Sequence, residues 1–145
     1  MTIVIGSDHA AIKLKAELIA HLSSLGHKLI DVGSDGRTSD YPDFAHKVCH
    51  TVLQKQANCG ILVCGTGIGM TIAANRYRGI RCALCTDEFS ARMSRYHNNA
   101  NVLALGCRVT GSGLALSIAE VFLTTDFSKE ERHARRLAKI DNAGQ

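Results

Sequence analysis

The sequence lacks several features that would direct its interpretation elsewhere. Its 145 residues include no tryptophan and a single proline, and aromatic residues make up only 5% of the chain. No apolar run approaches the ~20 residues that a membrane-spanning helix needs. The N-terminus enters a strand-like segment without the charged and apolar regions of a signal peptide. These absences predict a cytoplasmic protein that has no membrane partner.

Cysteine is plentiful, with six residues, but the pattern of a metal site is missing. Cys82 and Cys85 form one CxxC pair, and no second pair completes a tetrahedral zinc site. Both lie in a strand-like run, where residues three apart point to opposite faces of a sheet. We therefore predict reduced thiols, with these two cysteines in the core, and no bound metal.

An excess of charge of one sign is also missing, because the net charge is only +4. A modest positive charge suits a small anionic ligand. No motif typical of nucleic-acid binding accompanies it, so no nucleic-acid partner is expected. The chain has no internal repeat, low-complexity tract or linker, which predicts one domain over residues 1–145.

What the chain does contain is a regular alternation of strand-like and helix-like segments. The expected strands are 2–6, 28–32, 59–63, 81–85 and 102–105. The expected helices are 10–25, 43–56, one that ends near 75, 86–97, 114–123 and 129–140. Helix boundaries are indicated by Gly26, by Pro42 and by the capping-box spacing from Ser128 to Glu131. The alternation predicts an α/β fold with a doubly wound, five-stranded parallel sheet, Rossmann-like and three-layered, in the order 2-1-3-4-5.

The stretch after the third expected strand is the strongest functional signal. That strand stops at Cys64, and three glycines at alternate positions, Gly65, Gly67 and Gly69, then lead into a helix. Glycine can adopt φ > 0 and lets a backbone approach a ligand closely. The N–H groups of such a loop suit an anion or a developing oxyanion, and they favour a thiolate at Cys64. An ordinary βα turn can have the same composition, so the loop alone is a weak motif.

The predicted topology brings further polar groups to this loop. In doubly wound sheets, ligands bind beyond the carboxyl ends of the strands, at the switch point between the first and third strands. Asp8 and His9 follow the first strand, and Cys64 follows the third. His97 ends the helix before the fifth strand and is expected at the same carboxyl side. A cysteine base with a histidine acid is therefore one interpretation of this edge.

Other phosphate-binding or nucleotide-binding loops fit less well. A cysteine phosphatase loop would place arginine where Met70 stands, and a P-loop would end in Gly-Lys-Ser/Thr. The dinucleotide fingerprint G-x-G-x-x-G differs from the G-x-G-x-G found here, although Asp87 lies about twenty residues further on. Paired arginines match the oxygens of a phosphate monoester. Arg132 and Arg136 share one helical face, and Arg108 follows the fifth strand.

Several segments together resemble one known family. They are Gly6 to Ala11, Asp40 to Asp43, Cys64 to Met70, Ala73 to Arg76, Gly79 to Arg81 and Ser94 to Arg108. In this order they resemble ribose-5-phosphate isomerase type B, whose superfamily includes galactose-6-phosphate isomerase subunits. The resemblance runs from residue 2 to about residue 140. It implies a cofactor-free aldose–ketose isomerase of the pentose phosphate pathway, which interconverts ribose 5-phosphate and ribulose 5-phosphate through a cis-enediolate.

The resemblance also implies roles for individual residues. Cys64 is similar to the base that removes the proton, His97 to the acid that opens the sugar ring, and Thr66 to a residue that assists ring opening. Further substrate-binding residues implied in this way are Asp8, His9, Tyr41, Gly65, Thr66, Gly67, Ile68, Gly69, Asn98, Arg108, Arg132 and Arg136. The family forms homodimers, or dimers of dimers, with sites shared between subunits.

The chain departs from the family pattern at one place. Glu130 and Glu131 precede Arg132, where relatives often have small residues, and this affects where the basic helix begins. A dinucleotide-dependent oxidoreductase and a non-catalytic sugar-phosphate-binding protein remain alternatives. The preferred sugar, among ribose, allose and galactose phosphates, is also left open by the sequence.

Overall fold

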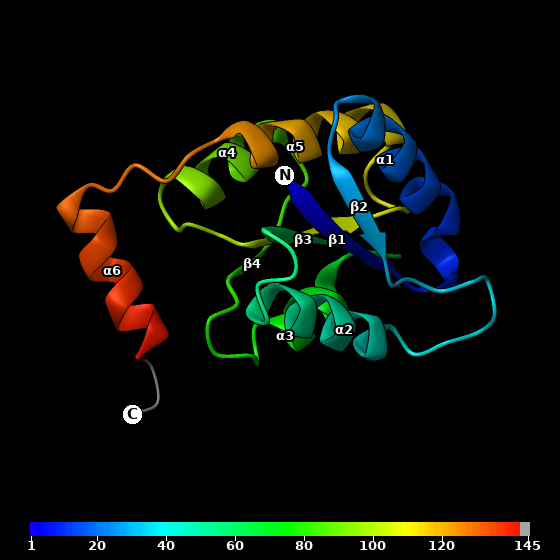
Figure 1. Cartoon of the computed structure of the whole chain (residues 1–145), viewed down its shortest axis with the longest axis horizontal. Coiled ribbons are helices and arrows are strands. Elements are labelled where there is room, and N and C mark those ends of the chain that lie inside the picture. The colour runs from blue at the N-terminus through cyan, green and yellow to red at the C-terminus, as the bar shows by residue number, and fades with distance from the viewer. Residues whose placement is uncertain (143–145) are drawn as a thin grey trace.

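The computed structural model describes residues 1–142, which form a parallel sheet with helices on both faces (Figure 1). The strands are β1 (Thr2–Ser7), β2 (Lys28–Asp31), β3 (Cys59–Cys64), β4 (Cys82–Leu84) and β5 (Val102–Gly106). Every pairing between neighbouring strands is parallel. The predicted α/β class and the doubly wound, three-layer sheet are confirmed.

Each predicted helix corresponds to an observed one. A short 3-10 turn, η1 (His9–Ala11), leads into the first of them. The helices are α1 (Ile12–Ser24), α2 (Tyr41–Leu53), α3 (Ile68–Ala74), α4 (Glu88–Tyr96), α5 (Ser112–Thr124) and α6 (Glu131–Asp141). Among residues 1–142, no helix combines the length and the apolar character that crossing a membrane requires.

The predicted order of the last two strands was wrong. The sheet runs β2-β1-β3-β5-β4, so β5 lies beside β3 and β4 forms the edge. All five residues of β5 are buried, whereas β4 has three residues and only Cys82 is buried. A longer, fully apolar strand gains more from a central position, and a short strand suits an edge. The right-handed crossover rule then places α4 on the face opposite α3, because the chain turns back from β4 to β5.

Two separate apolar clusters cover the sheet, one on each face, which explains why its strands are continuous apolar runs rather than alternating ones. The cluster beneath α1, α4 and α5 includes Ile5, Leu18, Ile61, Leu103, Ile118 and Phe122. The cluster beneath α2 and α3 includes Val4, Val48, Leu62, Met70, Ala74 and Val102. Figure 1 shows the two groups of helices on opposite sides of the strands.

Of the helix boundaries predicted from the sequence, those at Gly26 and Pro42 were confirmed and the one at Ser128 was wrong. Gly26 follows the end of α1 with φ of 83°, as expected for a residue after a helix C-terminus. Pro42 lies in the first turn of α2, also as predicted. The capping box at Ser128 was wrong, because the N-cap of α6 is Glu130 and no side chain caps the helix. The Ser128 hydroxyl instead accepts a hydrogen bond from the Glu130 N–H, at 3.4 Å.

Helix α6 lies beside the sandwich rather than in one of its layers (Figure 1). Its position is fixed at a few points. The linker before it is anchored where the Ser128 N–H donates to the Tyr96 carbonyl oxygen, at 3.0 Å. The end of the helix is held by an ion pair of 3.1 Å between Arg81 and Asp141. The helix that carries Arg132 and Arg136 is therefore anchored at both ends, and His133 and Leu137 are its buried residues.

Candidate functional site

The carboxyl ends of β1, β3 and β5 bring together most of the predicted site residues. Ser7 pairs with Val63, and Cys64 pairs with Gly106, so the residues that follow these strands are neighbours. The Asp8 N–H donates to the Val63 carbonyl oxygen, at 3.3 Å. We refer to Asp8, His9, Tyr41, Arg108 and the loop 64–69 as the carboxyl-edge cluster.

Cys64 lies at the centre of this cluster and is 5% exposed. Its Sγ accepts a hydrogen bond from the N–H of Gly67, at 3.1 Å. Gly67 has φ of 79°, a conformation that side chains other than glycine rarely adopt. A Cβ at this position would also lie 2.5 Å from Leu84 Cδ1. The glycine thus permits the turn that directs a backbone dipole at the sulfur, an arrangement that suits a thiolate.

The loop approaches β5 closely on its other side. A Cβ on Gly106 would lie 2.6 Å from the carbonyl of Thr66, so only glycine allows the two backbones to meet. Thr66 is exposed, and its hydroxyl accepts a hydrogen bond from the Ile68 N–H, at 3.3 Å. The Thr66 hydroxyl therefore stands at the mouth of the loop, close to Cys64 in the chain.

The remaining residues surround the loop. The Asp8 carboxylate caps η1 by accepting the Ala10 N–H at 3.0 Å, and the His9 side chain is exposed. Arg108 is exposed, and its guanidinium lies 3.5 Å from where a Cβ on Gly65 would be. Tyr41 is packed against Gly69, because a Cβ there would lie 2.6 Å from its ring. The loop is therefore flanked by a carboxylate, a guanidinium and an aromatic ring.

The predicted position of His97 was wrong. Helix α4 starts beyond the carboxyl end of β4 and runs back, so its C-terminus lies near the amino end of β5. His97 is the C-cap of this helix, four residues before Asn101, whose carbonyl accepts the Gly60 N–H at the start of the sheet pairing. Five residues of β5 separate the two edges, which at ~3.3 Å per residue is roughly 15 Å or more. Within one chain, His97 and Cys64 cannot meet.

His97 has companions at this opposite edge. Asn98 follows it, and α6 brings Arg132 and Arg136 to the same region, with both arginines exposed. Arg132 Nε pairs with the Glu130 carboxylate, at 2.8 Å. We refer to His97, Asn98, His133, Arg132 and Arg136 as the amino-edge cluster. The candidate site is thus divided into two halves at opposite edges of one sheet.

Two residues, one within the amino-edge cluster and one beside the carboxyl-edge cluster, were missed from the sequence. His133 is buried and stacks on His97, with ring centroids 4.4 Å apart. The sequence indicated its burial only through its spacing of four residues from Leu137, since these are the two buried residues of α6. Cys107 lies after β5, and its thiol donates to the Ala10 carbonyl oxygen at 3.4 Å. Burial, with a contribution from Asp8, raises the pKa of Cys107.

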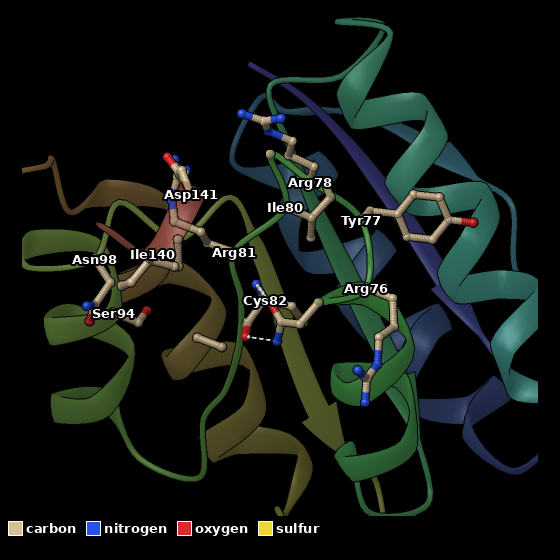
Figure 2. Close-up of a pocket in the computed structure, with 14 residues that line it drawn as sticks. Arg76, Tyr77, Arg78, Ile80, Arg81, Cys82, Ser94, Asn98, Ile140 and Asp141 are labelled. Carbon is tan, nitrogen blue, oxygen red and sulfur yellow. Dashed lines mark hydrogen bonds and ion pairs between the residues drawn. The ribbon is translucent and has the colours of Figure 1, made fainter. Parts of the chain in front are cut away.

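A cavity of about 710 Å³ lies apart from the glycine loop, and of the two clusters only Asn98 contributes to its lining. It lies between the segment 75–83, the end of α4 and the end of α6. Figure 2 shows that the side chains of Arg76, Arg78 and Arg81 point in different directions, and Arg81 approaches Asp141. Polar groups therefore do not converge in this cavity, as they do around Cys64. We place the candidate active site at the glycine loop for this reason.

Among the residues that the structure describes, the cysteines form no disulfide and no metal site. All six cysteines are free, and Cys82 and Cys85 are buried as predicted. Burial raises the pKa of Cys82 to about 12 and that of Cys85 to about 11, which makes both thiols unreactive. Over residues 1–142, no group of three or more histidine, cysteine or acidic side chains is arranged to hold a metal ion.

Comparison with known proteins identifies the family. Residues 3–140 match the family described as Ribose/Galactose Isomerase. The chain belongs to this family. Ribose-5-phosphate isomerase B from Escherichia coli is 42% identical over 139 residues, which cover 95% of this chain and 93% of that protein. Membership of the ribose/galactose isomerase family confirms the resemblance seen in the sequence and makes the chain an isomerase, an intramolecular oxidoreductase.

Solved structures of relatives agree with the fold. Ribose-5-phosphate isomerase B from Clostridium thermocellum superposes with a TM-score of 0.95 at 48% identity, over 97% of this chain and 95% of that one. A ribose 5-phosphate isomerase from Thermotoga maritima gives a TM-score of 0.94 at 50% identity, over 97% of both chains. The ribose/galactose isomerase fold thus extends over nearly all of this chain.

Proposed function

We propose that the protein interconverts ribose 5-phosphate and ribulose 5-phosphate without a cofactor, as one cytoplasmic domain that serves the pentose phosphate pathway. One observation carries this proposal. In a chain of the isomerase family, the Sγ atom of Cys64 accepts a hydrogen bond of 3.1 Å from the N–H of Gly67. A survey of ribose, allose and galactose phosphates with the purified protein tests it. Ribose 5-phosphate should give the highest kcat/KM, and no turnover of any of these sugars would contradict the proposal.

In the proposed reaction, Cys64 removes a proton from the carbon beside the carbonyl of the open-chain sugar. The resulting cis-enediolate carries negative charge on oxygen, and N–H groups of the loop 65–69 stabilise that charge. Preorganised donors of this kind typically lower such a barrier by about 3–4 kcal/mol. The same thiol then returns the proton to the neighbouring carbon, while the hydroxyl proton moves from one enediolate oxygen to the other, which completes the aldose–ketose exchange.

The sugar ring must open before this step. We assign the acid that protonates the ring oxygen to His97, with assistance from the Thr66 hydroxyl. Asp8, His9, Tyr41, Asn98 and Arg108 then hold the hydroxyl groups of the sugar. A histidine is suited to this step because its unperturbed pKa lies near neutral pH.

The division of the site supports a dimer in which each active site is shared. His97 and Cys64 lie at opposite edges of the sheet of one chain, so a second copy is needed to bring them together. We therefore propose that the amino-edge cluster of one subunit completes the carboxyl-edge cluster of its partner. A two-fold symmetric arrangement would form two such sites at once.

Arg132 and Arg136 bind the phosphate in this proposal. They lie one turn apart on α6, so their guanidinium groups share a face. Replacing Arg136 by alanine should raise KM for ribose 5-phosphate about tenfold or more, because a hydrogen bond to a charged group contributes ~1.5–3 kcal/mol. Steady-state kinetics measures this change.

Arg135→Ala is the matched control, because Arg135 is an exposed neighbour on the same helix with the same charge. It should leave KM close to the wild-type value. Equal effects of the two substitutions would indicate a general effect of charge rather than a phosphate site. An unchanged KM in folded Arg136→Ala would remove α6 from the phosphate site.

A further inference from the structure

The contact between α6 and the end of α4 is made by two histidine rings. His133 and His97 are stacked with ring centroids 4.4 Å apart and planes inclined by only 15°. His133 lies in the first turn of α6, and His97 is the C-cap of α4. The stack therefore joins the proposed ring-opening acid directly to the helix that carries the proposed phosphate-binding arginines.

His133 is unusually buried for a polar residue on this helix. It is 4% exposed, while the neighbouring residues Arg132 and Ala134 are exposed. Its Nε2 atom is buried and has no hydrogen-bond partner in the part of the chain that the structure describes. A buried polar atom without a partner costs free energy, so an apolar side chain would be the cheaper choice for packing alone. The ring at this position calls for another explanation.

The charges around His133 favour its neutral form. Burial lowers the pKa of His133, and the positive charges of His97, Arg132 and Arg136 lower it further, while Glu130 acts in the opposite direction. These are the charged groups that face the ring from α4 and from α6. At neutral pH, His133 therefore presents a neutral aromatic face to the ring of His97. Were both rings protonated, they would repel each other at this separation.

We propose that His133 is a positioning residue for His97, whose stacked ring fixes the orientation of the acid and couples it to the phosphate-binding helix. The proposal rests on the proposed role of His97 in ring opening. His133 itself acts through His97 and not on the substrate. Its effect should accordingly be confined to the ring-opening step.

Two substitutions separate stacking from other properties of His133. His133→Phe keeps a flat ring and removes the nitrogens, and His133→Leu keeps an apolar side chain and removes the ring. Two readouts are needed: turnover of cyclic ribose 5-phosphate, and deuterium wash-in from D₂O into open-chain ribulose 5-phosphate. We expect His133→Leu to lower cyclic turnover by about tenfold and wash-in by less than about twofold, and His133→Phe to keep both within about threefold of wild type.

A purely structural role predicts a different pattern. Misplacement of the whole helix would lower both readouts together, and phenylalanine would rescue neither. The double variant His97→Asn/His133→Leu provides a second test, because a residue that acts through His97 has no further effect once His97 is lost. Additive losses in the double variant would overturn the proposal. If His133→Leu does not fold, His133→Gln, which also lacks a ring, takes its place.

The failure of this proposal can be distinguished from failure of the proposed function. If His97→Asn slows cyclic turnover and His133→Leu does not, the stack has no positioning role and the function stands. If His97→Asn leaves cyclic turnover unchanged, the acid has been misassigned, and the role of His133 is overturned with it. The proton NMR signal of the His97 ring gives evidence without any substrate: it should lie upfield in wild type and His133→Phe, and shift downfield in His133→Leu.

Discussion

Cys64→Ala should abolish isomerisation and also the exchange of substrate protons with D₂O. Loss of a general base costs on the order of 10²–10⁴ in rate, and no other group replaces a thiol that lies against the glycine loop. Binding of the sugar phosphate should persist, because the proposed phosphate ligands lie on α6. Mass spectrometry of deuterium in the sugar measures the exchange, and calorimetry measures the binding.

His97→Asn provides the contrast, since it should affect a different step. Turnover of cyclic ribose 5-phosphate should fall, while deuterium wash-in with ribulose 5-phosphate should remain measurable. The ketose bypasses ring opening, because its phosphate occupies the oxygen that would close a furanose ring. Cys64→Ala would thus stop proton transfer at carbon, whereas His97→Asn would slow only the ring opening that precedes it.

Cys85→Ala is the matched control for a lost thiol. Cys85 is buried and burial raises its pKa to about 11, so it should contribute to stability and not to the rate per folded molecule. Near wild-type exchange in Cys64→Ala would show that the base lies elsewhere. Asp8 would then be the next candidate, because its carboxylate is in the same cluster and only 8% exposed.

The class of fold was predictable from the sequence. Each strand is a short apolar run, and in the helices apolar residues recur at the helical period. The strand order was not predictable in the same way. It depends on which of two neighbouring strands gains more free energy from a buried, central position. The three residues of β4 gain less than the five of β5. The fully apolar composition of 102–105, against a run 81–85 that begins with Arg81, indicates which of the two strands is the more buried.

The carboxyl-edge cluster was predictable because a strand end determines where the next residue lies. Asp8 follows β1 directly, Cys64 ends β3 and Arg108 lies two residues after β5, so the topology alone brings them together. His97 was misplaced because it follows a helix, and a helix that leaves the carboxyl edge returns to the amino edge. Helix polarity in the βα units would have given the correct side.

The relation between His97 and α6 could not be obtained from local patterns. The stacking of His133 on His97 depends on a linker that crosses from α5 and is anchored at Tyr96. Neither the spacing of the arginines nor the basic composition of the helix determines where such a linker leads. The capping-box prediction failed for a related reason, since the anchored linker places Glu130 rather than Ser128 at the start of α6.

The division of the site leads to the second large effect, which is restoration of activity by mixing two inactive proteins. Cys64→Ala retains an intact amino-edge cluster, and His97→Asn retains an intact carboxyl-edge cluster. If subunits exchange and each site is shared, a mixed dimer contains one site with both residues intact. Equal mixing should produce about half mixed dimers, so about a quarter of all sites, and of wild-type activity, should return.

The control for this experiment combines two defects of the same cluster. Cys64→Ala mixed with Arg108→Ala places both substitutions in the carboxyl-edge cluster, so every site in a mixed dimer lacks one of the two residues. Activity should then stay at the average of the two separate proteins, whereas the first mixture should exceed that average many times over. Analytical ultracentrifugation of the wild type should show a dimer or a larger assembly under assay conditions. A fully active monomer would contradict the shared site, because the roughly 15 Å or more of sheet between the two clusters leaves His97 out of reach of Cys64 in a single chain.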